Sequence, residues 1–169
     1  MNRFWVGIEV EDKLFLAWVA GFFDGEGCVI VEYSKSAGSA RGWRTRLLAT
    51  VTQTSIPCLE KIQDKLGGTI KVSDNRTAET RRWAVQYTLT YSNQEAHNFL
   101  KAIAPYSVVK KEQIDLALTY PLYDATGKKY GNKSNPLPDD VWERRLTIRD
   151  ELRGIRASMK TPARVRYDA

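Results

Sequence analysis

The stretch LAWVAGFFDGEG, from Leu16 to Gly27, constrains the fold of this chain more than any other part of the sequence. A run of apolar and small residues leads straight into Asp24 and Glu26, each followed by a glycine. Such a run predicts a largely buried helix, which we expect from about Lys13 to Phe23. A buried helix does not need two carboxylates at its tip, because buried charges must be paired or must bind a metal. The stretch therefore predicts that something is held where this helix ends.

Several classes of protein are disfavoured by composition. The chain has 169 residues, 43% of them hydrophobic, which predicts one domain with a real core. Cys28 and Cys58 stand in no metal-ligand or CxxC spacing, and His97, the single histidine, is read as structural. No run reaches the ~18 apolar residues of a membrane helix, and acids interrupt the N-terminal segment where a signal peptide would be apolar. We therefore expect an intracellular chain without a membrane partner, in an organelle, a bacterium or a phage host.

The positive charge is concentrated in two segments. The formal net charge is +6, which favours a polyanionic partner. Ser34 to Gln53 carries four cations and no acid, and Thr69 to Ser92 carries four cations against two acids. Both segments predict pairs of strands, so the charge is expected on a sheet. A basic, solvated surface without a partner is the alternative interpretation.

The expected order of elements is α-β-β-α-β-β-α, an α+β fold. Strands are expected at 28–34, 43–53, 69–74 and 81–92, and helices at 13–23, 55–68, 93–105, 110–120 and 139–159. We expect one domain, 1–169, with its core at about 13–120, followed by a helical extension and a basic tail at about 121–169.

Alternation along the strands predicts one apolar face and one polar face. Arginine, glutamine and threonine on the polar face suit base edges and phosphates in a major groove. The candidate nucleic-acid-binding residues on this face and in the hairpins are Cys28, Ile30, Glu32, Ser34, Arg41, Arg44, Arg46, Leu48, Thr50, Lys71, Arg76, Arg81, Arg82, Gln86 and Thr88.

The segment VAGFFDGEG, Val19 to Gly27, resembles the LAGLIDADG motif of the homing endonucleases. The segments VTQ (51–53), HNFL (97–100) and PYSVVKKEQ (105–113) also resemble family segments, and the resemblance covers about 14–120. It implies a homing-endonuclease fold with a saddle-shaped, four-stranded antiparallel DNA-binding sheet and, here, C-terminal helices.

The resemblance also implies a homodimer. The family fold places two motif helices side by side, and this chain holds one such motif. Small residues on one flank of the helix would let two copies approach closely. The expected interface residues are Ala17, Ala20, Gly21 and Asp24, with Asp24 also ending the helix and bracing the turn.

By the same resemblance, Glu26 and the Gly25 carbonyl bind the metal. Two Glu26 carboxylates in close company would repel without a divalent cation, and oxygen ligands favour Mg²⁺. We expect Mn²⁺ to substitute, and Ca²⁺ to bind without supporting cleavage. A calcium loop of EF-hand type is excluded, because its further acids are missing and a strand follows at once.

The catalytic residues implied by the resemblance are Glu26, Gln53 and Lys110. Gln53 would position water, and Lys110 would stabilise charge on the phosphate, with Lys111 as the alternative lysine. Some relatives carry an arginine four residues after the glutamine, where this chain has Pro57. Its role would fall to Arg76 or Arg81, or be absent.

The implied function is site-specific, metal-assisted hydrolysis of both strands of a long pseudo-palindromic DNA target. The resemblance implies cleavage across the minor groove, 3′ overhangs and intron mobility. Flanking phosphates could be neutralised by Lys128, Lys129, Lys133, Arg164 and Arg166. The alternatives are an intron maturase that binds host intron RNA, a DNA-binding regulator on the same scaffold, and a basic structural protein without a site.

Overall fold

The computed structural model describes residues 10–39, 41–73, 84–131 and 136–159. Its helices are α1 (Val10–Glu26), α2 (Ile56–Leu66), α3 (Gln94–Ile103), α4 (Lys111–Leu118) and α5 (Asp139–Ser158). Its strands are β1 (Gly27–Lys35), β2 (Trp43–Gln53), β3 (Thr69–Ser73) and β4 (Gln86–Ser92). The α-β-β-α-β-β-α order and the α+β class are confirmed, with α4 and α5 appended.

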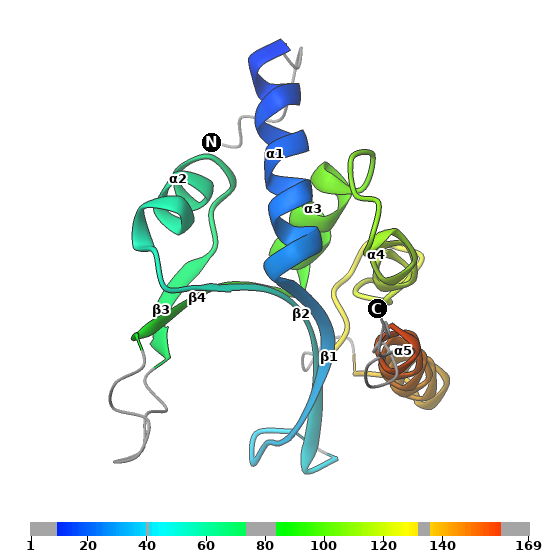
Figure 1. Cartoon of the computed structure of the whole chain (residues 1–169). Coiled ribbons are helices and arrows are strands. Elements are labelled where there is room, and N and C mark those ends of the chain that lie inside the picture. The colour runs from blue at the N-terminus through cyan, green and yellow to red at the C-terminus, as the bar shows by residue number, and fades with distance from the viewer. Residues whose placement is uncertain (1–9, 40, 74–83, 132–135, 160–169) are drawn as a thin grey trace, which may run out of the picture.

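The four strands form one antiparallel sheet in the order β1-β2-β4-β3. The sheet is strongly curved, and helices α1, α2 and α3 gather above it while α4 and α5 lie beside β1 (Figure 1). Below the sheet, the described part of the chain places no helix against its concave face (Figure 1). The curvature therefore leaves one broad face of the sheet open.

The alternation predicted from the sequence separates these two faces. Val29, Val31 and Ala49 point into the core, where they are at most 5% exposed, as are Leu89 and Tyr91 of β4. The core packs them against α1 and α3, with the Phe99 ring stacked on Tyr91 at a centroid distance of 4.2 Å. The alternate residues of each strand consequently lie on the open face.

Helix α1 passes into strand β1 without a loop. It extends beyond the expected end at Phe23, so that Asp24, Gly25 and Glu26 form its last turn. Gly27 opens β1 directly, and a Cβ there would lie 2.3 Å from Cδ2 of Phe23 and 2.5 Å from its carbonyl oxygen. Because such contacts are impossible, only glycine allows the chain to turn here. The acids are thus part of the helix rather than a tail behind it.

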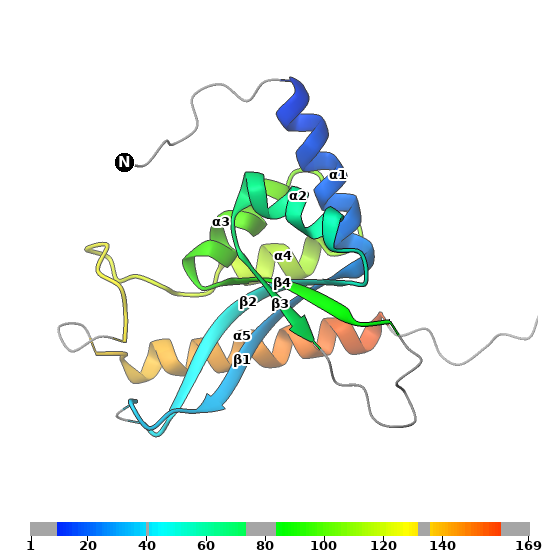
Figure 2. The ribbon, with the colours of Figure 1, turned by 90° about the vertical axis from the view of Figure 1, so that its left-hand side faces the viewer.

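Helix α5 packs along β1 at the edge of the sheet (Figure 2). Its inward face buries Ile148, Leu152 and Arg145, and the Arg145 guanidinium donates to the carbonyl of Pro121 at 2.7 and 3.0 Å. Helix α5 therefore belongs to the same packed body as the sheet.

No helix in the described part of the chain is both long and apolar enough to cross a membrane.

Candidate active site and nucleic-acid interface

Asp24 ties the end of α1 to the start of α4. Its carboxylate accepts hydrogen bonds from Ser107 Oγ at 2.6 Å and from the backbone N–H groups of Val108, Val109 and Lys110 at 2.7, 3.0 and 3.0 Å. Burial opposes ionisation, but these four donors outweigh it and hold the pKa of Asp24 below its usual range. Asp24 therefore braces the turn before α4 and does not end α1, where the sequence had placed its role, and its oxygens are engaged within its own chain.

The same turn aims Lys110 at the tip of α1. Lys110 Nζ donates to the carbonyl oxygen of Asp24. Burial lowers the pKa of Lys110, and the neighbouring Asp24, Cys28 and Glu26 partly offset that effect. Lys111 instead pairs with Asp115 on the exposed side of α4. The structure thus brings Lys110, and not Lys111, to the end of α1.

Glu26 and Gly25 are exposed at this tip. Within the described residues, no cation or hydrogen-bond donor pairs with the Glu26 carboxylate, unlike that of Asp24. Nothing lies within 4 Å of a Cβ placed on Gly25, so its backbone is open to approach from outside the chain. The described residues also contain no group of three or more His, Cys, Asp or Glu side chains that could hold a metal alone.

Gln53 is the last residue of β2, where it pairs with Tyr87 of β4. Val51 pairs with Gly27, the first residue of β1, so Gln53 lies two residues beyond that pair. Its Oε1 accepts from the Thr54 N–H at 2.8 Å, and its Nε2 amide group has no acceptor among the residues that the structure describes. Pro57 opens α2 and brings no charge of its own.

The open face of the sheet carries cross-strand polar pairs. Arg46 donates to Glu32 at 2.8 Å, and this hydrogen bond lowers the pKa of Glu32. Arg44 donates to Ser34 at 3.2 Å, and these two residues form the next cross-strand pair of β1 and β2 on this face. These contacts hold each side chain in place without removing its remaining donors and acceptors.

The middle of this face is threonine-rich and less exposed. Thr52 and Thr88 share a hydrogen bond of 3.0 Å between their hydroxyls, and Thr88 also pairs with Lys71 of β3. Thr52 was missed as a candidate, although it alternates with Thr50 and shares its face. The face also holds Cys28, Ile30, Thr50, Gln86 and Leu48, of which Leu48 is only 9% exposed.

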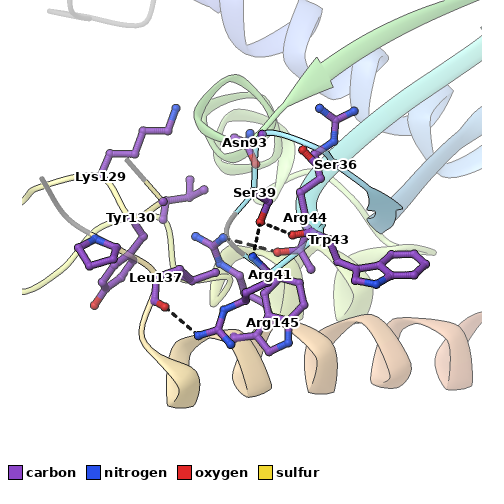
Figure 3. A pocket seen from close by; sticks show the side chains of 16 residues that line it. Ser36, Ser39, Arg41, Trp43, Arg44, Asn93, Lys129, Tyr130, Leu137 and Arg145 are labelled. Atoms are coloured by element: carbon purple, nitrogen blue, oxygen red, sulfur yellow. Dashed lines mark hydrogen bonds between the residues drawn. The ribbon is translucent and has the colours of Figure 1, made fainter. Parts of the chain in front are cut away.

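Arg41 lies in the β1–β2 loop, as expected, but its side chain turns toward the start of α5. It donates to the Leu137 carbonyl at 3.1 Å, pairs with Asp139 and lies over the Trp142 ring. It therefore lines a cavity of about 660 Å³ between the β1–β2 loop and the start of α5 (Figure 3). The structure ties Arg41 to α5 rather than to the open face. Arg76, Arg81 and Arg82 lie outside the described residues.

One flank of α1 is exposed. Ala17, Gly21 and Gly25 lie on it, with Leu14 and Trp18 at 68% and 40% exposure. Ala20, expected on this flank, is instead fully buried in its own core, because it lies on the side of the helix shared with Leu16 and Phe23.

Comparison with known proteins shows which family this chain resembles. Residues 19–121, more than half of the chain, match the family model described as LAGLIDADG endonuclease. The intron-encoded DNA endonuclease ai2b of Dictyostelium discoideum is 24% identical over 142 residues, which are 82% of this chain. The matched region spans about half (51%) of that relative's length.

Solved structures share the fold. The homing endonuclease I-CvuI in complex with the I-CreI target has a TM-score of 0.67 and 20% identity, with 92% of this chain and 88% of that one covered. The archaeal intron-encoded homing endonuclease I-Vdi141I, complexed with DNA, has a TM-score of 0.64 and 22% identity, with 85% of each chain covered. The family match and the shared fold agree, and the chain belongs to the LAGLIDADG endonuclease family.

Proposed function

We propose that this protein is a site-specific homing endonuclease that acts as a homodimer on double-stranded DNA. The observation that carries the proposal is the tip of α1. Glu26 is exposed there without a pairing cation among the described residues, Lys110 reaches the carbonyl of Asp24, and Gln53 ends β2 two residues beyond the partner of Gly27. A binding protein has no need of an unpaired acid beside a half-buried lysine. A phosphodiester hydrolase needs both.

The exposed flank of α1 supports pairing with a second copy. A Cβ on Gly21 or Gly25 would meet nothing within 4 Å among the described residues, so these two glycines leave the exposed flank of α1 open. A second α1 related by a two-fold axis would pack against this flank, because small residues let two backbones approach closely.

Pairing would also complete a metal site. The donor set, Glu26 with the Gly25 carbonyl and their twins, consists of oxygen ligands, which suit Mg²⁺ or Mn²⁺. A divalent ion bound there would polarise the phosphate and lower the pKa of the attacking water. Structures of the relative I-CvuI were determined in the presence of Mg or of Ca. Cleavage with Mg²⁺, and binding without cleavage with Ca²⁺, are the expected pattern.

Two side chains of this chain would then serve the reaction directly. Gln53, whose amide nitrogen has no acceptor among the described residues, would orient the attacking water. Lys110, held by the Asp24 carbonyl, would stabilise the charge that develops on the phosphate. Partial burial strengthens that interaction, because less water screens it.

The open face of each sheet would lie along the major groove of one half-site. Glu32, Arg44 and Arg46 present donors and acceptors from fixed positions, as base readout requires. Two such faces would read a long pseudo-palindromic target. Cleavage of both strands there would leave 3′ overhangs and promote intron mobility.

The experiment is selection and cleavage of a randomised duplex library with Mg²⁺ and with Ca²⁺. The variant Glu26→Gln is compared with Glu143→Gln, which changes an exposed glutamate of α5. We expect Mg²⁺-dependent double-strand cuts at one two-fold site, lost in Glu26→Gln and kept in Glu143→Gln, with binding intact in both. Site-selective binding without cuts under either metal would refute the nuclease and leave a regulator or a maturase.

A further inference from the structure

Helix α5 brings an arginine to the edge of the proposed nuclease site. Arg156 lies in the last turns of α5, and its Nη1 is 3.5 Å from Sγ of Cys28, 128 positions away in the sequence. Cys28 follows Glu26 and Gly27 directly at the start of β1. In Figure 2, the C-terminal end of α5 lies on the same side of the molecule as the end of α1.

The approach of α5 is fixed by buried contacts. Leu152, one turn before Arg156, is fully buried, and Gln113 Nε2 donates to Sδ of Met159 at 3.0 Å. Gln113 belongs to the first turn of α4, which begins directly after Lys110. The last turn of α5 is therefore packed against the element that positions Lys110.

Arg156 keeps guanidinium donors that no described residue uses. Its Nε makes a long hydrogen bond of 3.4 Å to the Leu152 carbonyl, and a thiol is a weak acceptor for Nη1. Among the described residues, no carboxylate lies within ion-pair distance of its guanidinium. By contrast, Arg149 and Arg153 of the same helix both lie within that distance of Asp150.

We propose that Arg156 is a second cation of the nuclease site and donates to the scissile phosphate from the side of α5. This inference rests on the proposed function. Arg156 would act beside Lys110, at a site where Pro57 supplies no charge. The planar guanidinium matches two phosphate oxygens at once, which a lysine cannot do.

The chemical role follows from the hydrolysis itself. The water oxygen bonds to phosphorus, the bond from phosphorus to the leaving oxygen breaks, and the water proton passes to solvent. Negative charge grows on the non-bridging and leaving oxygens, and the leaving oxygen takes up a proton from solvent. Arg156 would stabilise that charge, so its contribution should appear in the rate of cleavage more than in binding.

The experiment compares Arg156→Gln, Arg156→Ala and Arg156→Lys with the control Arg153→Gln, which removes an exposed charge from the same helix. The single-turnover rate is measured with Mg²⁺ on the site recovered by library selection. We expect a loss of roughly 10²-fold in Arg156→Gln, partial recovery in Arg156→Lys, and no loss in the control. Free guanidinium should raise the rate of Arg156→Ala, which a purely structural arginine would not allow.

A wild-type rate in Arg156→Gln would overturn the inference while leaving the proposed function intact. A wild-type protein that binds without cutting would instead refute the proposed function. Binding of a random-sequence duplex pool in Ca²⁺ then decides about Arg156. A phosphate contact requires Arg156→Gln to lower the slope of log Kd against log salt by about two, one for each subunit of the dimer, and an unchanged slope would overturn it.

Discussion

Replacing Gly21 by alanine should stabilise the single chain and weaken the dimer, two effects with opposite signs. A Cβ on Gly21 meets nothing within 4 Å in its own chain, so the free energy of unfolding should rise by about 1 kcal/mol through reduced backbone entropy. For a chain of this size, that gain corresponds to roughly 2–4 °C in Tm, measured on dilute monomer.

The dimer should respond in the other direction. Each added methyl would lie between two closely packed helices, where overpacking costs about 1–3 kcal/mol, and the two-fold axis repeats the change. We therefore expect a loss of about 2–6 kcal/mol in dimerisation, which sedimentation equilibrium would show as a Kd raised by at least ~30-fold.

Gly154 provides the matched control. It also lies inside a helix and is exposed, and a Cβ added there would meet nothing within 4 Å, so Gly154→Ala should give the same gain in Tm. It should leave dimerisation unchanged, because α5 is outside the proposed interface. A Gly21→Ala protein that dimerises like the wild type would refute the pairing of α1 helices.

Three further outcomes are expected from the site and its supports. Asp24→Asn should lose about 1–2 kcal/mol at neutral pH, since a partly exposed carboxylate with four donors is replaced by a weaker acceptor. The pKa of Asp24 is lowered by folding, so the stability advantage of the wild type is fully present above the pKa of the unfolded chain, near 3.8. The advantage should disappear as the pH falls through the lower pKa of the folded protein, which urea unfolding at a series of pH values would show. Gly27→Ala should lower stability by more than ~2 kcal/mol in thermal melts, because the added carbon meets the Phe23 backbone and ring; equal melting temperatures would contradict the close approach. Lys110→Met should reduce single-turnover cleavage by roughly 10²-fold while Lys111→Met does not, and equal losses would show that both lysines serve the site.

Much of the fold was predictable, because its signals are local. Alternation in β1 and β2 separated the core face from the open face, and Pro57 with the pair Gly67 and Gly68 bounded α2. The end of α1 was placed too early, since acids after an apolar run indicate a helix end. The turn is in fact set by the space at Gly27, which depends on where the Phe23 ring lies.

The site was predictable only where it follows a motif. Glu26, Gln53 and Lys110 came from segments that resemble the family, and the structure separates Lys110 from Lys111 through the Asp24 brace. Ala20 was misplaced, and the contact of Arg41 with the start of α5 was not foreseen, because helix rotation and the docking of α5 are tertiary properties. Arg156 carries no local signal, since its neighbour Cys28 is far away in the sequence.

The direct passage from Glu26 in α1 to Gly27 in β1 restricts how this gene can change in length. One inserted residue would turn the carboxylate by about 100° around the helix axis, or exchange the two faces of β1. Either result would separate the acid from the sheet face proposed to read the target. Insertions and deletions should therefore be absent at this junction and accumulate in the β1–β2 loop and in the segment before α5. Under the proposed function, substitution on the sheet face is the remaining route by which such a protein can acquire a new target.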